Sequence, residues 1–517
     1  MEVPLKRVRL NLVSPGWNRC PGVYCRAGIR GALRADSFTH CSSPDDVVAA
    51  LKAIPGFFAV VVVRADWIVA AVDRVRSIPL FYGHDPQKGV VVISDDPRWI
   101  EQELGTNGRD PISLCEIMQT GYVTGNRTLS TNVYQLQAGE FLTVSQNAGT
   151  PKLAVRRYFL LGEGQACVEE RELSVWAEHL DAVVRASCNS LMEYAAGRAL
   201  VLPLSGGYDS RLLAVTLARA GYENLHAFSY GRPENRESAK SRAVAEWLGI
   251  RWHFIEYNER LWYSWFHSNE RHNYFRFADG LGSVPHIQDW PAVRELLHRQ
   301  AIPSDSIIVP GHTVALSRSG YPETGGIDAI VQAIRRKHYK GTPAPRQQQK
   351  EVVEKLRNVV GALDVDTGAG GGPSLLMERW EWQERHAKYV INSVRAYEFF
   401  GLDWWLPLWD HRVIGMWHSV PTYLRDGKRV YKDYVEGLSS GVSTVVPKPA
   451  TGFSKIRTAL LDALRVRKLL KRASEYERNP LAWYGIMPKS KFRRIYDGRD
   501  SIATLLAREW FGQEDFR

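Results

Sequence analysis

The pattern of hydrophobic and polar positions divides the chain into a β-rich first part and a mixed second part. Short apolar runs separated by turn residues predict strands across residues 1 to about 160. The clearest of these runs are Val60–Val63, Trp67–Val72 and Val90–Ser94. A long helical pattern follows at Glu169–Leu191. From Asp328 onward the periodicity is mostly helical, and the glycine-rich stretch Gly368–Gly372 is expected to form a mobile loop.

Between these two parts, short apolar runs alternate with amphipathic stretches. The expected elements are a strand at 202–204, a helix at Arg211–Ala220, a strand at Leu225–Tyr230, a helix ending at Gly249 and a strand at Trp252–Tyr257. This spacing predicts a parallel sheet, because parallel strands need helical crossovers. Ligands of such sheets bind at the carboxyl ends of the strands.

The first strand of this unit runs into a Ser-Gly-Gly turn. The local sequence is Leu202-Pro203-Leu204-Ser205-Gly206-Gly207-Tyr208-Asp209-Ser210. Adjacent glycines let the backbone approach an anion, and the helix that follows offers free N–H groups. Asp209 can hold a divalent cation against phosphate oxygens. The pattern indicates a pyrophosphate cradle and cleavage of ATP between its α and β phosphates; the alternative is an ordinary strand-to-helix turn. No Walker-type Gly-Lys-Ser/Thr triplet is present.

The chain resembles the asparagine synthetase family, whose synthetase domain carries a Ser-Gly-Gly-x-Asp-Ser pyrophosphatase loop. The likeness extends over most of the chain. Its N-terminal matches are Gly56-Phe57-Phe58-Ala59, Asp73-Arg74, Pro79-Leu80-Phe81-Tyr82, Ser94-Asp95-Asp96-Pro97 and Thr128-Leu129 through Gly139-Glu140-Phe141-Leu142. Its C-terminal match is the stretch Gly401–Asp410. Asn392-Ser393-Val394-Arg395 is similar to a branch associated with surface-polysaccharide gene clusters.

The resemblance implies a mixed fold, α/β together with a β-rich part. Residues 1–165 are expected to form a degenerate class-II glutamine amidotransferase-like domain, a glutaminase-like sandwich of the Ntn type. Residues 170–517 are expected to form an ATP-pyrophosphatase (PP-loop) synthetase domain, like the adenine nucleotide α hydrolases, with a helical C-terminal part.

The nucleophile of the glutamine-hydrolysing relatives is missing. Those members use an N-terminal cysteine exposed by removal of the initiator methionine, whereas Glu2 follows Met1 here and the nearest cysteines are Cys20 and Cys25. We therefore expect no glutaminase activity from this chain. Its nitrogen would come from ammonia, from a substrate amine or from a partner glutaminase.

The resemblance implies three catalytic residues in the second part. His312, after Ile307-Ile308-Val309-Pro310-Gly311, occupies the place of the family's catalytic Glu or Tyr and suits a general base, because imidazole titrates near neutrality. Its alternative is a core or turn histidine. Lys448 matches the family's lysine that stabilises both transition states; a solvated loop lysine is its alternative. Asp403 is expected to orient His312 or bind the amine, with an ion pair as the alternative. Glu237 matches a family acid but could equally be a surface residue.

One departure concerns the metal. The family places a second metal-binding Asp where this chain has Ala315. Mg²⁺ would then rely on Asp209 and water, or on another acid such as Asp279 or Asp289. A third possibility is weak activity, which keeps a non-catalytic protein open as an alternative.

Bulk properties fit a globular protein. The 517 residues are 44% hydrophobic and 24% charged, with a net charge of +11. No signal peptide and no apolar run long enough for a membrane span are visible, so a cytoplasmic location is expected. The six cysteines form no Cys-x-x-Cys pair, which disfavours zinc and redox sites. No nucleic-acid-binding module is recognisable.

The sequence thus predicts an ATP-dependent amide ligase that adenylates a carboxylate and joins it to an amine or ammonia. The carboxylate is expected on a sugar, a peptide or a secondary metabolite. The cofactors are ATP and Mg²⁺, with Asp209 as the metal ligand. The expected nucleotide-binding residues are Leu202, Leu204, Ser205, Gly206, Gly207, Asp209, Ser210, Ser229, Gly231 and Gly311. The alternative is a nucleotide- or partner-binding protein without catalysis.

Overall fold

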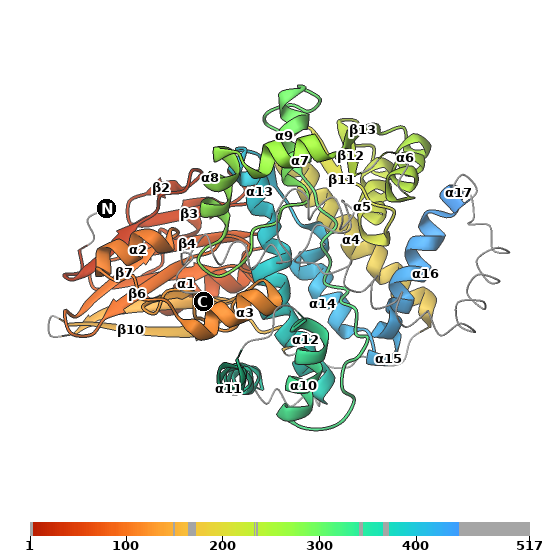
Figure 1. Ribbon diagram of the computed structural model, residues 1–517. Coiled ribbons are helices and arrows are strands. Elements are labelled where there is room, and N and C mark those ends of the chain that lie inside the picture. Colours follow the sequence, from red (N-terminus) through yellow and green to blue (C-terminus); the bar gives the residue numbers. More distant parts are fainter. Residues whose placement is uncertain are drawn as a thin grey trace.

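The computed structural model describes residues 4–147, 150–163, 172–231, 233, 236–340, 345–364 and 372–443 (Figure 1). Lys448 and nearly all of the loop predicted at Gly368–Gly372 lie outside these ranges.

The first part of the chain forms two sheets that face each other. One sheet has the order β1 (Val8–Asn11), β7 (Val90–Ser94), β6 (Phe81–Asp85) and β8 (Val133–Gln135). The other has the order β10 (Thr150–Arg157), β9 (Glu140–Asn147), β5 (Trp67–Val72), β4 (Phe58–Val63), β3 (Val23–Ala27) and β2 (Asn18–Cys20), antiparallel throughout. Helices η1 (Ala35–Phe38), α1 (Pro44–Ala53), α2 (Pro97–Leu104) and α3 (Pro111–Thr120) accompany them.

Strand β4 shows why the sequence of the first part contains unbroken runs of apolar residues. All six of its residues are buried. Ala59, Val61 and Val63 join the large core of the molecule, whereas Phe58, Val60 and Val62 join a second core on the opposite face, which also contains α1 residues. A sheet buried on both faces needs apolar side chains at every position. The strands predicted at Val60–Val63, Trp67–Val72 and Val90–Ser94 are confirmed.

The second part contains the predicted parallel sheet. Its order is β13 (Arg251–Glu256), β12 (Leu225–Gly231), β11 (Leu200–Pro203), β14 (Ile307–Ile308) and β15 (Asp403–Trp404), and every pair is parallel. The surrounding helices are α4 (Leu173–Ala195), α5 (Tyr208–Arg219), α6 (Arg236–Leu248), α7 (Glu259–Phe266), α8 (Asn269–Ala278) and α9 (Trp290–His298). The helix predicted at Glu169–Leu191 is thus observed as α4, which starts later and ends later.

The remainder is helical, as the periodicity predicts. It comprises α10 (Ile327–His338), α11 (Arg346–Leu363), α12 (Gly372–Trp380), η2 (Glu381–Val390), η3 (Ile391–Val394), α13 (Arg395–Phe399), η4 (Pro407–Trp409), α14 (His411–Ser419), α15 (Thr422–Arg425), η5 (Asp426–Lys428), α16 (Arg429–Leu438) and α17 (Ser440–Ser443). Element η2 is a π-helix of ten residues, a rare conformation that is frequent at functional sites.

The two sheet systems are packed against each other. In Figure 1 the sandwich lies on the left, the parallel sheet at the upper right, and η2 with its neighbours between them. The large core is continuous from β4 and β5 to β11, β14 and the C-terminal helices. At the junction, Trp404 N donates to Gly28 O over 3.0 Å. Within the described ranges, no helix is long and apolar enough to cross a membrane.

Candidate active site

The Ser-Gly-Gly turn connects β11 to α5 at the carboxyl edge of the parallel sheet. Ser205 N donates to the Ser210 hydroxyl over 3.1 Å, and Gly207 N donates to the Ser205 hydroxyl over 3.1 Å. Gly207, the N-cap of α5, has no side chain to cap the first helical turn. The first-turn amides therefore keep the donor capacity that a phosphate oxygen would use.

Glu237 on α6 holds the turn in place. Its Oε2 accepts from Gly206 N over 2.8 Å, and a Cβ built on Gly206 would come within 2.9 Å of the same oxygen. Glu237 is thus an exposed residue, as its alternative had it, that also contacts the turn.

Asp209 is the charged group at the start of α5. Burial raises the pKa of its carboxyl group, and the ammonium group of Lys428 opposes that rise. Oxygen Oδ1 is buried and accepts no hydrogen bond from a described residue. The hydroxyl of Tyr431 lies next to both Asp209 and Thr313. Lys428 itself has a left-handed backbone, with φ of 59°, at the start of α16.

A cavity of about 1150 Å³ opens beside Asp209. Its walls are rich in hydroxyl and charged side chains, among them Ser317, Arg318, Ser319, Tyr321, Glu323, Ser374, Thr422, Tyr423, Asp426, Lys428, Tyr431 and Lys432. Sequence reasoning missed Lys428 and Tyr431. No pattern marks them, because they reach Asp209 only through the packing of α16 against α5, elements far apart along the chain.

The segment after β14 packs directly on the turn. A Cβ built on Gly311 would lie 2.7 Å from Ser210 N, so only glycine fits there without displacing the turn. The next residue, His312, is half-buried, and its Nε2 lies 3.4 Å from the Ser393 hydroxyl of η3. The predicted juxtaposition of Gly311 with the Ser-Gly-Gly turn is therefore observed.

The expectation that His312 titrates near neutrality is wrong for this environment. Burial lowers the pKa of His312 to about 4, and the nearby His286 lowers it further while Asp289 opposes the change. The imidazole is thus neutral at physiological pH and can accept a proton, but it holds that proton weakly.

Asp403 does not orient His312. Its Oδ1 pairs with Arg30 at 3.0 Å, and its Oδ2 pairs with Arg198 at 2.7 Å. Both oxygens are therefore occupied by guanidinium groups. These contacts favour the ion-pair alternative for Asp403.

Asp279 and Asp289, the two further acids considered as metal ligands, both bind other side chains. Asp279 forms a bidentate ion pair with Arg98 of the sandwich, at 2.8 and 2.6 Å. Asp289 accepts from the hydroxyls of Tyr230 and Tyr397 at 2.5 and 2.6 Å. Ala315 is buried in the large core. No group of three or more His, Cys, Asp or Glu side chains is arranged to hold a metal ion in the part of the chain that the structure describes.

The remaining nucleotide-site predictions fall at the ends of β11 and β12. Ser229 and Gly231 close β12, and Gly231 has a positive φ of 125°. Leu202 and Leu204, by contrast, have their side chains in the large core. Only the backbone of these two leucines is thus left to meet a ligand. Lys448 lies outside the described residues.

Two described cysteines of the sandwich, Cys25 and Cys115, are poor nucleophiles. Cys25 is buried, and burial raises the pKa of its thiol to about 11. Burial likewise raises the pKa of Cys115 to about 11. Because the thiolate is the reactive form, these thiols are unreactive near neutral pH.

Residues 46–159 match the glutamine amidotransferase domain, and residues 179–266 match asparagine synthase. Together these two matches support an asparagine synthase-family amidotransferase. The second match contains the Ser-Gly-Gly turn, and it supports ATP-dependent amide-forming chemistry in general and the use of ATP. The two matches together imply a substrate and an amine or ammonia.

The chain is also similar to individual proteins. The 7-cyano-7-deazaguanine synthase of Microcystis aeruginosa (strain NIES-843 / IAM M-2473) is 28% identical over 183 residues, which cover 35% of this chain and 69% of that protein. The NH3-dependent NAD synthetase of Campylobacter jejuni subsp. jejuni NCTC 11168 has 14% identity and a TM-score of 0.23, over 43% of this chain and 96% of that chain. A predicted subunit of a tRNA methyltransferase from Methanocaldococcus jannaschii has 16% identity and a TM-score of 0.14, over 30% of this chain and 74% of that chain. Likeness at these TM-scores carries no inference about this chain.

Proposed function

We propose that the chain is an amide ligase that activates a carboxylate by adenylation. The observation that carries the proposal is Asp209: a buried carboxylate with an unpartnered oxygen, at the start of a helix behind a Ser-Gly-Gly turn, bordering a large polar cavity. Ser205, Gly206, Gly207, Ser210 and Gly311 shape that turn, and Ser229 and Gly231 lie at the neighbouring strand end.

In the first half-reaction a carboxylate oxygen of the substrate attacks the α-phosphorus of ATP. The bond from that phosphorus to the bridging oxygen breaks, and pyrophosphate leaves. The amides of the turn and the Lys428 ammonium group would receive the charge on the phosphate oxygens. The unpartnered Oδ1 of Asp209 fits a Mg²⁺ ion, which when bound neutralises charge on the phosphates.

In the second half-reaction the amine nitrogen attacks the carbonyl carbon of the acyl-adenylate. The carbon–oxygen bond to AMP breaks, and AMP leaves with that oxygen. His312 would take the proton that the nitrogen loses. Because the pKa of His312 is low, its imidazole is neutral near pH 7 and can accept a proton, and it then releases that proton readily to solvent.

We propose that residues 1–165 support the synthetase part, residues 170–517, without hydrolysing glutamine. The buried, high-pKa thiols of Cys25 and Cys115 favour this division. Nitrogen would then come from ammonia, a substrate amine or a partner glutaminase. For the carboxylate, the hydroxyl-rich cavity walls fit a polar substrate such as a sugar acid or a peptide. We place the protein in the cytoplasm.

A second candidate is a non-catalytic nucleotide-binding protein. The buried Ala315, where the family has a metal-binding Asp, favours it.

The test is carboxylate-dependent exchange of labelled pyrophosphate into ATP, measured with Mg²⁺ and a panel of sugar acids, amino acids and peptides. Adenylation predicts exchange with at least one carboxylate and none without it. If ATP binds and no carboxylate elicits exchange, the non-catalytic alternative holds.

A further inference from the structure

Tyr431 of α16 lines the cavity beside Asp209 and has a buried hydroxyl group. Only 2% of the residue is exposed, and its hydroxyl oxygen forms no hydrogen bond with a described residue. The hydroxyl lies next to Asp209 and Thr313, but the geometry of a hydrogen bond is met with neither. Since a buried hydroxyl normally has a partner, the open cavity is where a ligand would supply one.

The other three described tyrosines of the cavity wall need no such partner. The hydroxyls of Tyr208 and Tyr321 each donate to a glutamate, and Tyr423 is 58% exposed and faces water. Among the described tyrosines that line the cavity, Tyr431 is therefore the one whose buried hydroxyl is left for a ligand.

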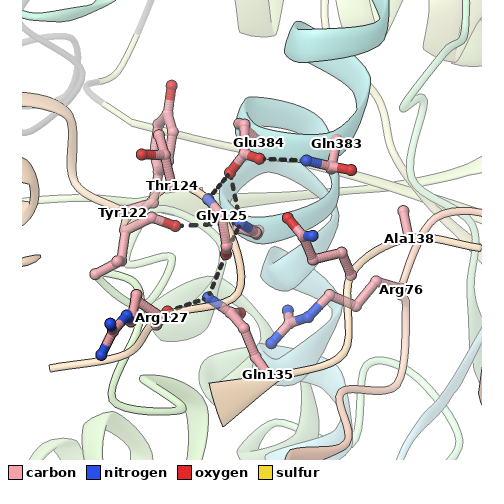
Figure 2. Close-up of polar contacts among 12 residues, drawn as sticks. Arg76, Tyr122, Thr124, Gly125, Arg127, Gln135, Ala138, Gln383 and Glu384 are labelled. Atoms are coloured by element: carbon pink, nitrogen blue, oxygen red, sulfur yellow. Dashed lines mark hydrogen bonds and ion pairs between the residues drawn. The ribbon is translucent and has the colours of Figure 1, made fainter. Parts of the chain in front are cut away.

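Tyr122, in the cluster that Figure 2 shows, also has a buried hydroxyl without a partner among the described residues. It does not line the cavity. The carboxylate of its cluster is engaged, because Glu384 accepts from Gly125 N over 3.0 Å and from Gln383 Nε2 over 2.6 Å (Figure 2). Tyr431 differs in both respects, since it borders an open cavity and lies beside a carboxylate that has an unpartnered oxygen.

The N-terminus of α16 gives this side of the cavity a positive charge. Lys428, the N-cap of this ten-residue helix, offers no side-chain acceptor to the first-turn amides, which therefore keep donor capacity. Lys428 and Lys432 stand one helical turn apart, both line the cavity, and neither forms an ion pair with a described carboxylate. A helix N-terminus beside two ammonium groups attracts an anion.

The acidic side chains of the cavity wall are not paired with these lysines. Asp426 is bound to Arg318 at 2.7 Å, and Glu323 is exposed. Asp209, at the N-terminus of α5, is the proposed Mg²⁺ ligand. An anion of phosphate type therefore fits between Asp209 and α16, because both helix N-termini lie at this cavity.

We propose that Tyr431 binds the pyrophosphate leaving group, with its hydroxyl donating a hydrogen bond to a phosphate oxygen. This inference rests on the proposed adenylation. When the bond from the α-phosphorus to the bridging oxygen breaks, its electron pair stays on that oxygen and the pyrophosphate gains negative charge. A phenol keeps its proton near neutral pH, so Tyr431 stabilises that charge without transferring the proton. The Ser-Gly-Gly turn and α16 then hold the pyrophosphate from two sides.

Tyr434 provides a matched control on the same helix. Its hydroxyl donates to Asp181 Oδ1 over 2.7 Å, and it does not line the cavity. Tyr434→Phe removes a hydrogen bond of the fold, whereas Tyr431→Phe removes a hydroxyl that the fold does not use. The two variants should therefore have opposite effects on stability and on binding.

The first measurement is the binding of inorganic pyrophosphate to the full chain at saturating Mg²⁺, by titration calorimetry. Tyr431→Phe should raise the Kd of pyrophosphate by roughly tenfold, the value of one hydrogen bond to a charged group, and keep the Kd of AMP and the unfolding temperature. Tyr434→Phe should keep the Kd of pyrophosphate and lower the unfolding temperature.

An unchanged Kd of pyrophosphate in Tyr431→Phe would overturn the proposal, as would a wild type that binds no pyrophosphate. A variant that differs from the wild type only in the Mg²⁺ concentration it needs would also overturn it, because Tyr431 would then serve Asp209 and not the phosphates.

Carboxylate-dependent pyrophosphate exchange separates this inference from the proposed function. Where the wild type exchanges, Tyr431→Phe should lower the rate by roughly 10²-fold, the cost of removing one donor at a developing charge. Full exchange in the variant would overturn the role of Tyr431 and leave adenylation standing. Tyr431-dependent binding of pyrophosphate without any exchange by the wild type would reject adenylation and keep the pyrophosphate site.

Discussion

The Ser-Gly-Gly turn and the interior of the sandwich treat buried carboxylates in opposite ways. Asp209 keeps one oxygen unpartnered and borders a large cavity. Asp73, fully buried in the sandwich, accepts hydrogen bonds from Phe58 N, Val75 N and the Ser77 hydroxyl. A buried carboxylate whose oxygens all accept hydrogen bonds stabilises the fold around it. A buried carboxylate with an oxygen that accepts none, beside an open cavity, is suited to bind a ligand.

The sandwich also forms charge pairs with the second part of the molecule, as in Arg26 with Glu398 at 3.0 Å.

The largest expected effect comes from neutralising Asp209. Asp209→Asn should lower carboxylate-dependent pyrophosphate exchange by roughly 10²–10³-fold or more, since it removes the charge that serves the phosphates. The unfolding temperature of the variant should stay close to that of the wild type, because the amide of asparagine has nearly the same shape as the carboxylate. Asp433→Asn, an exposed acid on α16, is the matched control. Pyrophosphate exchange by Asp209→Asn above a tenth of the wild-type rate would contradict the proposed role of the Asp209 carboxylate at the phosphates.

His312 separates the two half-reactions. His312→Ala should keep pyrophosphate exchange while amide formation falls by roughly 10²–10⁴-fold, the usual contribution of a positioned general base. Because burial lowers the pKa of His312 to about 4, the wild-type amide-forming rate should not decline through a pKa near 6.5 and should fall only as the pH approaches 4. An inflection near 6.5 that His312→Ala removes would show that the imidazole is solvated during turnover.

Acid stability tests the burial of the histidines around η2. Burial lowers the pKa of His386 to about 3, and that of His312 and of His418 to about 4. The unfolded chain takes up these protons near pH 6.5, so the stability they contribute is complete above that pH and is lost as the pH falls toward 4. Each contributes a slope of about 1.4 kcal/mol per pH unit.

Asp73 opposes this trend, because burial raises its pKa to about 6 and the folded state then binds a proton that the unfolded state lacks. For His312, His386, His418 and Asp73 taken together, the slope should correspond to about two protons, three taken up by the unfolded histidines less one bound by folded Asp73. His386→Asn should reduce it by about one proton, as measured by urea unfolding between pH 6.5 and 5. An unchanged slope would mean that His386 is protonated in the folded state.

The smallest effect is expected from the sandwich thiols. Cys25→Ala should leave ammonia-dependent product formation within about twofold of the wild type, because burial raises the pKa of this thiol to about 11, and a thiol of that kind is a poor nucleophile. The wild type should produce no glutamate from glutamine. Thiol-dependent glutamate release would show that the sandwich has kept its chemistry.

The sequence predicted the elements that are fixed by local pattern. The unbroken run Val60–Val63 and the alternation from Leu200 to Glu256 each appear as predicted, because burial on two faces and βα spacing leave direct traces in the chain. Gly311, which the family resemblance placed at the nucleotide site, does contact the turn.

What the sequence could not supply depends on distant packing. Lys428 of η5 and Tyr431 of α16 lie near Asp209, and the arginines that pair with Asp403 come from two separate segments. The low pKa of His312 results from its burial, which depends on tertiary packing. The spacing of apolar residues did not reveal the π-helix η2.

The central claim, adenylation of a carboxylate at the Ser-Gly-Gly turn, is tested most directly by isotope transfer. A carboxylate that supports pyrophosphate exchange is labelled with ¹⁸O, and the nucleotide products of amide formation are examined by ³¹P NMR and mass spectrometry. The account predicts AMP carrying one ¹⁸O on its phosphorus, together with unlabelled pyrophosphate. ADP with ¹⁸O in orthophosphate, or AMP without label, would contradict it.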